Sequence, residues 1–91
     1  MGTYTIDCAE VTNEESFWRA YLSATTPEGA GYFGRNLDAF WDALHGGPGW
    51  PGECDLCFIN TSSINNFREG QFYSALLQIA KDSKHVRVRL E

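Results

Sequence analysis

The chain has 91 residues, of which 43% are apolar and 14% aromatic. We expect it to form a single domain over residues 1–91 around one hydrophobic core. Twelve acidic and seven basic side chains give a formal net charge of −5, and a surface of that sign repels nucleic-acid phosphates. The longest wholly apolar stretch, Leu56–Ile59, is far shorter than the ~20 residues that cross a bilayer. The composition therefore argues against nucleic acid and membrane as partners.

The first residues carry neither the basic region nor the apolar run of a secretory signal, so we expect a cytoplasmic protein. Its three cysteines, Cys8, Cys54 and Cys57, are an odd number, whereas small disulfide-held domains usually carry an even number. Cys54 and Cys57 spell C-x-x-C, but this pattern runs into an apolar segment instead of a helix start. A zinc site would need two further ligands, which only Cys8, His45 and His85 could supply. We interpret all three cysteines as buried or half-buried inert thiols, and expect no metal and no cofactor.

The first part of the chain predicts a strand and a helix. Residues 3–8 alternate between polar and apolar side chains, as strands do. Thr12–Glu15 reads as a capping box with Thr12 as the N-cap. A helix over about 13–23 follows and ends at the breaker 25–27. Residues 27–34 are rich in glycine and predict a loop that presents aromatic rings.

The clearest helix follows Asn36, which is a good N-cap residue. Leu37, Phe40, Trp41 and Leu44 fall on one face at helical spacing. The run of glycines and prolines over 46–52 ends this helix.

The second half predicts two more strands and one more full helix. The apolar run 56–59 predicts a central strand covered on both faces, and 61–68 allows a short helical turn. Gly70 precedes a helix whose apolar face holds Phe72, Leu76, Ile79 and Ala80, and 86–90 alternates like an edge strand with exposed arginines. The order β-α-α-β-(α)-α-β predicts an α/β fold: a three-stranded parallel sheet packed with three to four helices.

The predicted second helix carries Asp38 and Asp42 one turn apart, with His45 three residues further on. The two carboxylates repel each other by roughly 0.2–0.5 kcal/mol. Asp42 also lies near the carboxyl end, where the helix dipole disfavours an anion. Residues 28–67 hold five acidic residues and one basic residue, together with several aromatic ones. This composition is typical of a surface that binds a cationic partner.

Other interpretations of this helix remain open. From the spacing alone, the favoured interpretation is a helix without a binding role. Its apolar side chains then pack in the core, and the two aspartates lie on an ordinary solvent-exposed face. Paired carboxylates with a histidine also suit acid–base or metal-dependent hydrolysis. The sequence supplies no nucleophile with its base, and the glycine-rich loop lacks the lysine of a phosphate cradle.

The segment 32–42 reads Tyr-Phe-Gly-Arg-Asn-Leu-Asp-Ala-Phe-Trp-Asp. This run, from the aromatic pair through Asn-Leu-Asp-Ala to Trp-Asp, resembles the barstar family of intracellular ribonuclease inhibitors. The similarity continues to the aromatic-proline pair Trp50–Pro51, and more faintly over the last helix and strand. The element order derived above is also that of the family.

The resemblance implies a bacterial 1:1 inhibitor, and not an enzyme, that blocks the active site of a secreted guanyl-specific ribonuclease. Asp42 would stand in for the scissile phosphate, Asp38 would pair with a second basic residue, and Tyr32 would cover the catalytic histidine. The other implied contacts are Phe33, Gly34, Asn36, Leu37, Trp41, His45 and Gly46. The remaining alternative within this fold is an interaction module for another basic protein.

The sequence departs from the family pattern at two places. The last helix lacks an acidic residue at the matching stretch, where Asp82 is the nearest acid, and Gly47 stands where barstar has tryptophan. We therefore expect the target to be a different ribonuclease of the same class as barnase. The resemblance also implies a cis Trp50–Pro51 bond.

Overall fold

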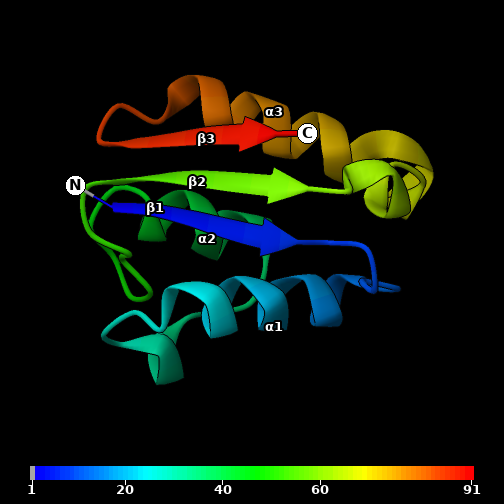
Figure 1. Ribbon diagram of the computed structural model, residues 1–91. Coiled ribbons are helices and arrows are strands. Elements are labelled where there is room, and N and C mark those ends of the chain that lie inside the picture. Colours follow the sequence, from blue (N-terminus) through cyan, green and yellow to red (C-terminus); the bar gives the residue numbers. More distant parts are fainter. Residues whose placement is uncertain (1) are drawn as a thin grey trace.

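The computed structural model describes residues 2–91. Three strands, three α-helices and three short 3-10 turns, labelled η, follow one another along these residues (Figure 1). In chain order they are β1 (Gly2–Asp7), α1 (Glu14–Thr25), η1 (Ala30–Tyr32), α2 (Leu37–Ala43), β2 (Cys54–Ile59), η2 (Thr61–Ile64), η3 (Phe67–Gly70), α3 (Gln71–Asp82) and β3 (Val86–Leu90). The predicted α/β class and element order are confirmed.

The sheet has the strand order β1-β2-β3, and both pairs are parallel. In the register, Tyr4 lies opposite Leu56, and Leu56 opposite Val88. Each connection between parallel strands carries at least one helix, as parallel pairing requires.

The helices cover one face of the sheet, and the prediction that β2 is covered on both faces is wrong. Side chains of the covered face are buried, for example Ile6 and Phe58, whereas Thr5 and Arg89 on the opposite face are exposed. Figure 1 shows α2 behind the strands, with α1 and α3 on either side of it. Cys57 is nevertheless buried on the open face, because it lies between the side chains of both neighbouring strands. The apolar run in β2 therefore reflects the central position of this strand and not a second layer of helices.

An aromatic cluster fills the space between the helices and the sheet. Phe17 of α1 stacks on Phe58 of β2 with ring centroids 5.2 Å apart. Trp18 contacts the ring of Phe40 from α2 at 5.4 Å, and all four residues are almost fully buried. Burial of rings this large is the main favourable contribution to folding in so small a domain. The cluster also fixes where α2 lies.

Helix α1 begins one residue later than the sequence pattern predicts. Asn13, and not Thr12, has the extended N-cap conformation, and its side chain accepts a hydrogen bond from the Ser16 amide at 2.8 Å. The Ser16 hydroxyl accepts from the Asn13 amide at 3.1 Å, so the capping box pairs Asn13 with Ser16. The helix ends at Thr25, within the predicted breaker, and Thr26 turns left-handed with φ 39°.

Two details of the second half also differ from expectation. The single helical turn allowed over 61–68 is two separate 3-10 turns, η2 and η3. The Trp50–Pro51 bond is trans, because residues 2–91 contain no cis peptide. The chain reverses here through glycines with positive φ, among them Gly46 at 98°, Gly49 at 91° and Gly52 at 86°, so the turn does not need a cis proline.

Candidate functional site

The candidate site is built on α2, which starts as predicted at Asn36. The Asn36 side chain accepts a hydrogen bond from the Ala39 amide at 2.7 Å and donates one to the Gly34 carbonyl at 3.2 Å. Gly34 packs closely here, since a Cβ atom at this position would lie 3.1 Å from the Cβ of Ala39. Asn36 and Gly34 therefore fix the start of α2 against the preceding loop.

The two aspartates of α2 are both exposed, Asp38 in the first turn and Asp42 in the last. Neither takes part in the ion pairs found among residues 2–91. The last turn of α2 carries no basic residue to offset its dipole. The short helix thus presents two uncompensated negative charges to solvent.

Aromatic side chains flank these charges. The ring of Tyr32 is 84% exposed in η1, and that of Trp41 is 44% exposed on α2. Trp41 stacks on the imidazole of His45, with ring centroids 3.9 Å apart and planes inclined by 23°. His45 Nδ1 lies 2.6 Å from the Trp41 carbonyl oxygen and donates to it, because a carbonyl oxygen can only accept. Large exposed rings beside charges are typical of protein interfaces.

The carboxyl end of α2 is closed by a tight turn. The amides of His45 and Gly47 both donate to the Asp42 carbonyl, at 3.0 and 2.9 Å. The Asp42 carboxylate lies against Gly47, where a Cβ atom would come within 2.7 Å of Oδ2. Gly46 supplies the positive φ of 98° that the turn requires.

Two predicted site residues do not belong to the exposed surface. Phe33 is only 5% exposed and contacts the rings of Trp18 and Tyr21, each at 5.7 Å. Its ring therefore completes the core, whereas the neighbouring Tyr32 is exposed, so this loop presents one of its two aromatic rings to solvent. That Phe33 contacts a partner stays a prediction. Leu37 is half-buried against the core at the start of α2. The eight other predicted residues are all exposed.

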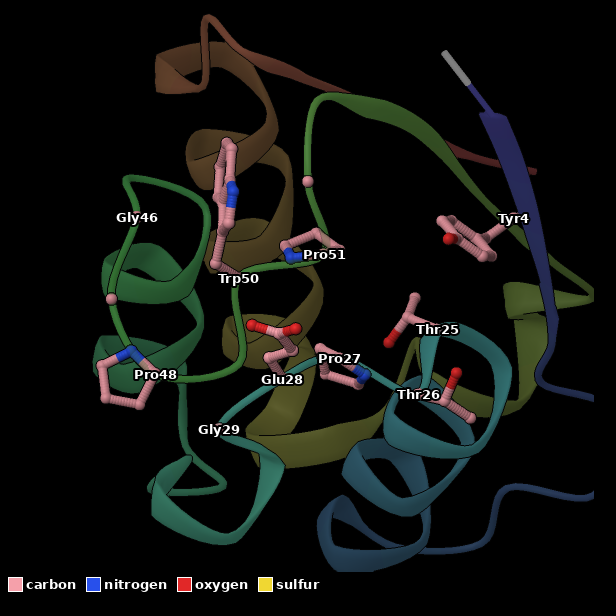
Figure 2. A pocket seen from close by; sticks show the side chains of 12 residues that line it. Tyr4, Thr25, Thr26, Pro27, Glu28, Gly29, Gly46, Pro48, Trp50 and Pro51 are labelled. Carbon is pink, nitrogen blue, oxygen red and sulfur yellow. The ribbon is translucent and has the colours of Figure 1, made fainter.

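A cavity of about 660 Å³ adjoins this surface. It lies between the end of α1 with residues 26–29, which we call the 26–29 loop, and residues 46–52, which we call the 46–52 loop (Figure 2). Its wall shares Gly46 and Gly47 with the turn that ends α2. In Figure 2 the Glu28 carboxylate points toward Pro51, the Trp50 ring points away from Glu28, and Tyr4 lies on the opposite wall.

Sequence reasoning did not predict this cavity. Its two loops are separated along the chain, and their proximity is a property of the fold. One local signal was present: both loops contain glycine and proline, and both follow a helix whose last turn lacks a basic residue. That combination marks two negative helix ends, but not that the two loops lie side by side.

The cysteines form a separate group. Cys8, Cys54 and Cys57 are all free and buried, as predicted. Burial raises the pKa of Cys8 to about 11 and is the main cause that raises the pKa of Cys54. A hydrogen bond from Cys57 to Glu91, 3.2 Å long, raises the pKa of Cys57. Such thiols stay protonated at neutral pH and are poor nucleophiles.

Residues 2–91 show neither a metal-binding cluster nor a membrane-spanning helix. Among residues 2–91, no three His, Cys, Asp or Glu side chains group together in a way that could hold a metal ion. No helix of this part of the chain is long and apolar enough to cross a membrane.

The fold and surface together define a class of small α/β domains that expose an acidic, aromatic-flanked helix over one end of a parallel sheet. Comparison with known proteins is consistent with this description. Residues 1–89 match the family model described as Barstar (barnase inhibitor), so the chain belongs to the barstar family. A search of curated proteins found no match. The family is one of inhibitors, and its members bind ribonucleases of the barnase kind.

Proposed function

We propose that this protein is a 1:1 inhibitor of a secreted guanyl-specific ribonuclease and that it acts in the bacterial cytoplasm. The observation that carries the proposal is the pair of exposed, uncompensated carboxylates on α2, Asp38 and Asp42. Membership of the barstar family supports the same kind of partner.

The chemistry of such a partner fits this surface. The active site of a ribonuclease must stabilise a phosphate, so it gathers cationic side chains in a cleft. Asp42 offers a carboxylate that replaces the phosphate, and Asp38 offers a second anion one helical turn away. When the cationic groups arrive, they remove the repulsion between the two aspartates and the conflict of Asp42 with the helix dipole.

The flanking side chains supply the apolar part of the contact. Tyr32 and Trp41 expose large rings on either side of the carboxylates, and Asn36, His45 and Gly46 shape the helix ends between them. Rings that exclude water around an ion pair strengthen its electrostatic attraction. Leu37 and Phe33 act beneath this surface, by fixing the position of α2 and of the loop before it.

Titration into a ribonuclease assay tests the proposal. Increasing amounts of the protein should abolish RNA cleavage by a guanyl-specific ribonuclease, with an end point at one equivalent. Asp42→Ala should weaken inhibition by about 2–5 kcal/mol, mostly through faster dissociation, because it leaves the enzyme's cations buried without a counter-ion. The control Glu10→Ala removes an equally exposed acid outside α2 and should change inhibition little.

The alternatives have distinct outcomes. If wild-type protein inhibited no ribonuclease of a panel of this class, the proposal would be wrong, and a different basic partner would remain. Equal inhibition by wild type and Asp42→Ala would show that α2 is not the inhibitory surface.

A further inference from the structure

We propose that the cavity beside α2 receives a lysine or arginine side chain of the same ribonuclease and is a second cation-binding site of the inhibitor. This inference rests on the proposed function. It concerns residues outside the predicted partner contacts on and around α2, mainly Glu28 and Trp50.

The electrostatics of the cavity favour a cation. Glu28 is the one charged residue among those that line it, and no Lys, Arg or His of the described chain lines the wall. The wall also includes Thr25 and Thr26 at the carboxyl end of α1, and Gly46 and Gly47 just beyond the carboxyl end of α2. Each helix end carries roughly half a negative charge. Neither α1 nor α2 has a basic residue in its last turn, so a carboxylate and residues next to two helix ends line the same space without a cation from the described chain.

The shape and lining suit a side chain with a long apolar stem. Trp50 and Tyr4, both half-buried, contribute aromatic rings to the wall, and three prolines contribute further apolar surface. Lysine and arginine combine methylene groups, which pack on such surfaces, with a charged head that is attracted to aromatic faces. The cavity therefore has a surface for the stem and an anion, Glu28, for the head.

The cavity exists before any partner binds. The buried hydroxyl of Tyr21 donates to the Gly49 carbonyl at 2.9 Å and ties the 46–52 loop to α1. Gly49 lies against Phe33, since a Cβ atom there would be 2.9 Å from the ring. Gly29 has φ 76°, and a Cβ atom on it would lie 3.6 Å from the Gly49 amide nitrogen, so the two loops approach closely. A preformed cavity avoids the entropy cost of ordering loops on binding.

The same partner reaches both sites because they are continuous. The chain passes from Asp42 through Gly46 and Gly47 directly into the cavity wall. An enzyme that places its phosphate-binding groups on Asp42 therefore brings its rim next to the cavity. A basic side chain on that rim would enter the cavity with its charged head at Glu28.

The test compares Glu28→Gln with Glu10→Gln in the ribonuclease inhibition assay. Both variants remove one exposed negative charge, and only Glu28 lines the cavity. We expect Glu28→Gln to raise the inhibition constant about tenfold, mainly through a faster dissociation rate, and Glu10→Gln to change it by about twofold or less. Circular dichroism of both variants checks that the fold is retained. Hydrogen exchange of the wild-type complex should show protection of the amides in both loops.

Each outcome decides the matter. Equal effects of the two variants, or unprotected loop amides, would overturn the cavity site while wild-type inhibition upholds the proposed function. A Glu28→Gln effect confined to the association rate and lost in high salt would indicate long-range steering and would overturn it too. Wild-type protein that inhibits no such ribonuclease would overturn the proposed function and, with it, this partner for the cavity.

Discussion

Helices α1 and α2 each carry two acidic residues, but the two pairs have opposite surroundings. In α1, Glu14 and Glu15 lie in the first turn, where the helix dipole favours them. Glu14 forms a two-pronged ion pair with Arg68, at 2.6 and 2.7 Å, and Glu15 pairs with Arg19 at 3.2 Å. In α2, neither aspartate is paired, and Asp42 lies at the unfavourable end.

The comparison separates acids that stabilise the fold from unpaired acids, which we propose bind a partner. Helix α1 is 12 residues long and buries a broad aromatic face, whereas α2 has seven residues and leaves Trp41 44% exposed. A helix as short as α2 depends on its cap and on packing for its stability. The rest of its surface is thus available for binding.

The largest expected effect contrasts one aromatic residue from each helix. Phe17→Ala on α1 should lower the free energy of unfolding by about 3–5 kcal/mol, because Phe17 is fully buried. Trp41→Ala on α2 should lower it by about 1 kcal/mol or less and weaken ribonuclease inhibition instead. Urea denaturation at equilibrium measures the first quantity, and the inhibition assay the second. A large stability loss in Trp41→Ala would make α2 a structural helix like α1.

The two N-caps allow a matched test of intermediate size. Asn13→Ala and Asn36→Ala each remove a side-chain hydrogen bond to a backbone amide, 2.8 and 2.7 Å long. Each should cost about 0.5–2 kcal/mol of unfolding free energy, measured by thermal or urea denaturation. Only Asn36→Ala should also weaken inhibition, because only α2 carries the proposed site. Equal inhibition by both variants would contradict this assignment.

Neutralising one acid in each helix should change stability in opposite directions. Asp42→Asn should raise the free energy of unfolding by about 0.3–1 kcal/mol, because it removes an anion from the negative end of α2. Glu14→Gln should lower it by up to about 1 kcal/mol, because it breaks the pair with Arg68. Both differences should shrink in 1 M NaCl if they are electrostatic. Two changes of the same sign would remove the contrast between the helices.

The smallest expected effect concerns a paired acid outside both helices. The pKa of Asp7 lies below its ordinary value because the Asn60 side chain and the Ala9 amide both donate to its carboxylate at 2.9 Å. Asp7 therefore adds stability above its ordinary pKa, and this contribution is lost as the pH falls through the lower, folded-state pKa. Asn60→Ala should raise the pKa toward the ordinary value in an NMR titration. An unchanged pKa would show that the hydrogen bond is not its cause.

Much of the fold could be predicted from local patterns. Alternation identified β1 and β3, and Asn36 and Gly70 marked the starts of α2 and α3 as the structure has them. Such signals succeed because caps and periodicity act within one or two turns of the chain. The first cap was misplaced by one residue because Asn13 and Thr12 are both good N-cap residues, and the hydrogen bond from the Ser16 amide to the Asn13 side chain decides between them.

What failed depends on contacts between distant segments. The motif that identified the site could not show that Phe33 points into the core, since that depends on its contacts with Trp18 and Tyr21. The apolar run of β2 could not distinguish a second helical layer from shielding by neighbouring strands. The cavity arises where two loops meet, and no local pattern contains that meeting.

Phe33 has a consequence for how this protein can change its target. It lies between the rings of α1 and the backbone of Gly49, so the proposed recognition surface is joined directly to the hydrophobic core. Lengthening or reshaping either loop would disturb the packing of the whole domain. Adaptation to a new enzyme is therefore expected through exchange of outward-facing side chains, such as Tyr32, His45 and Glu28, on an unchanged backbone.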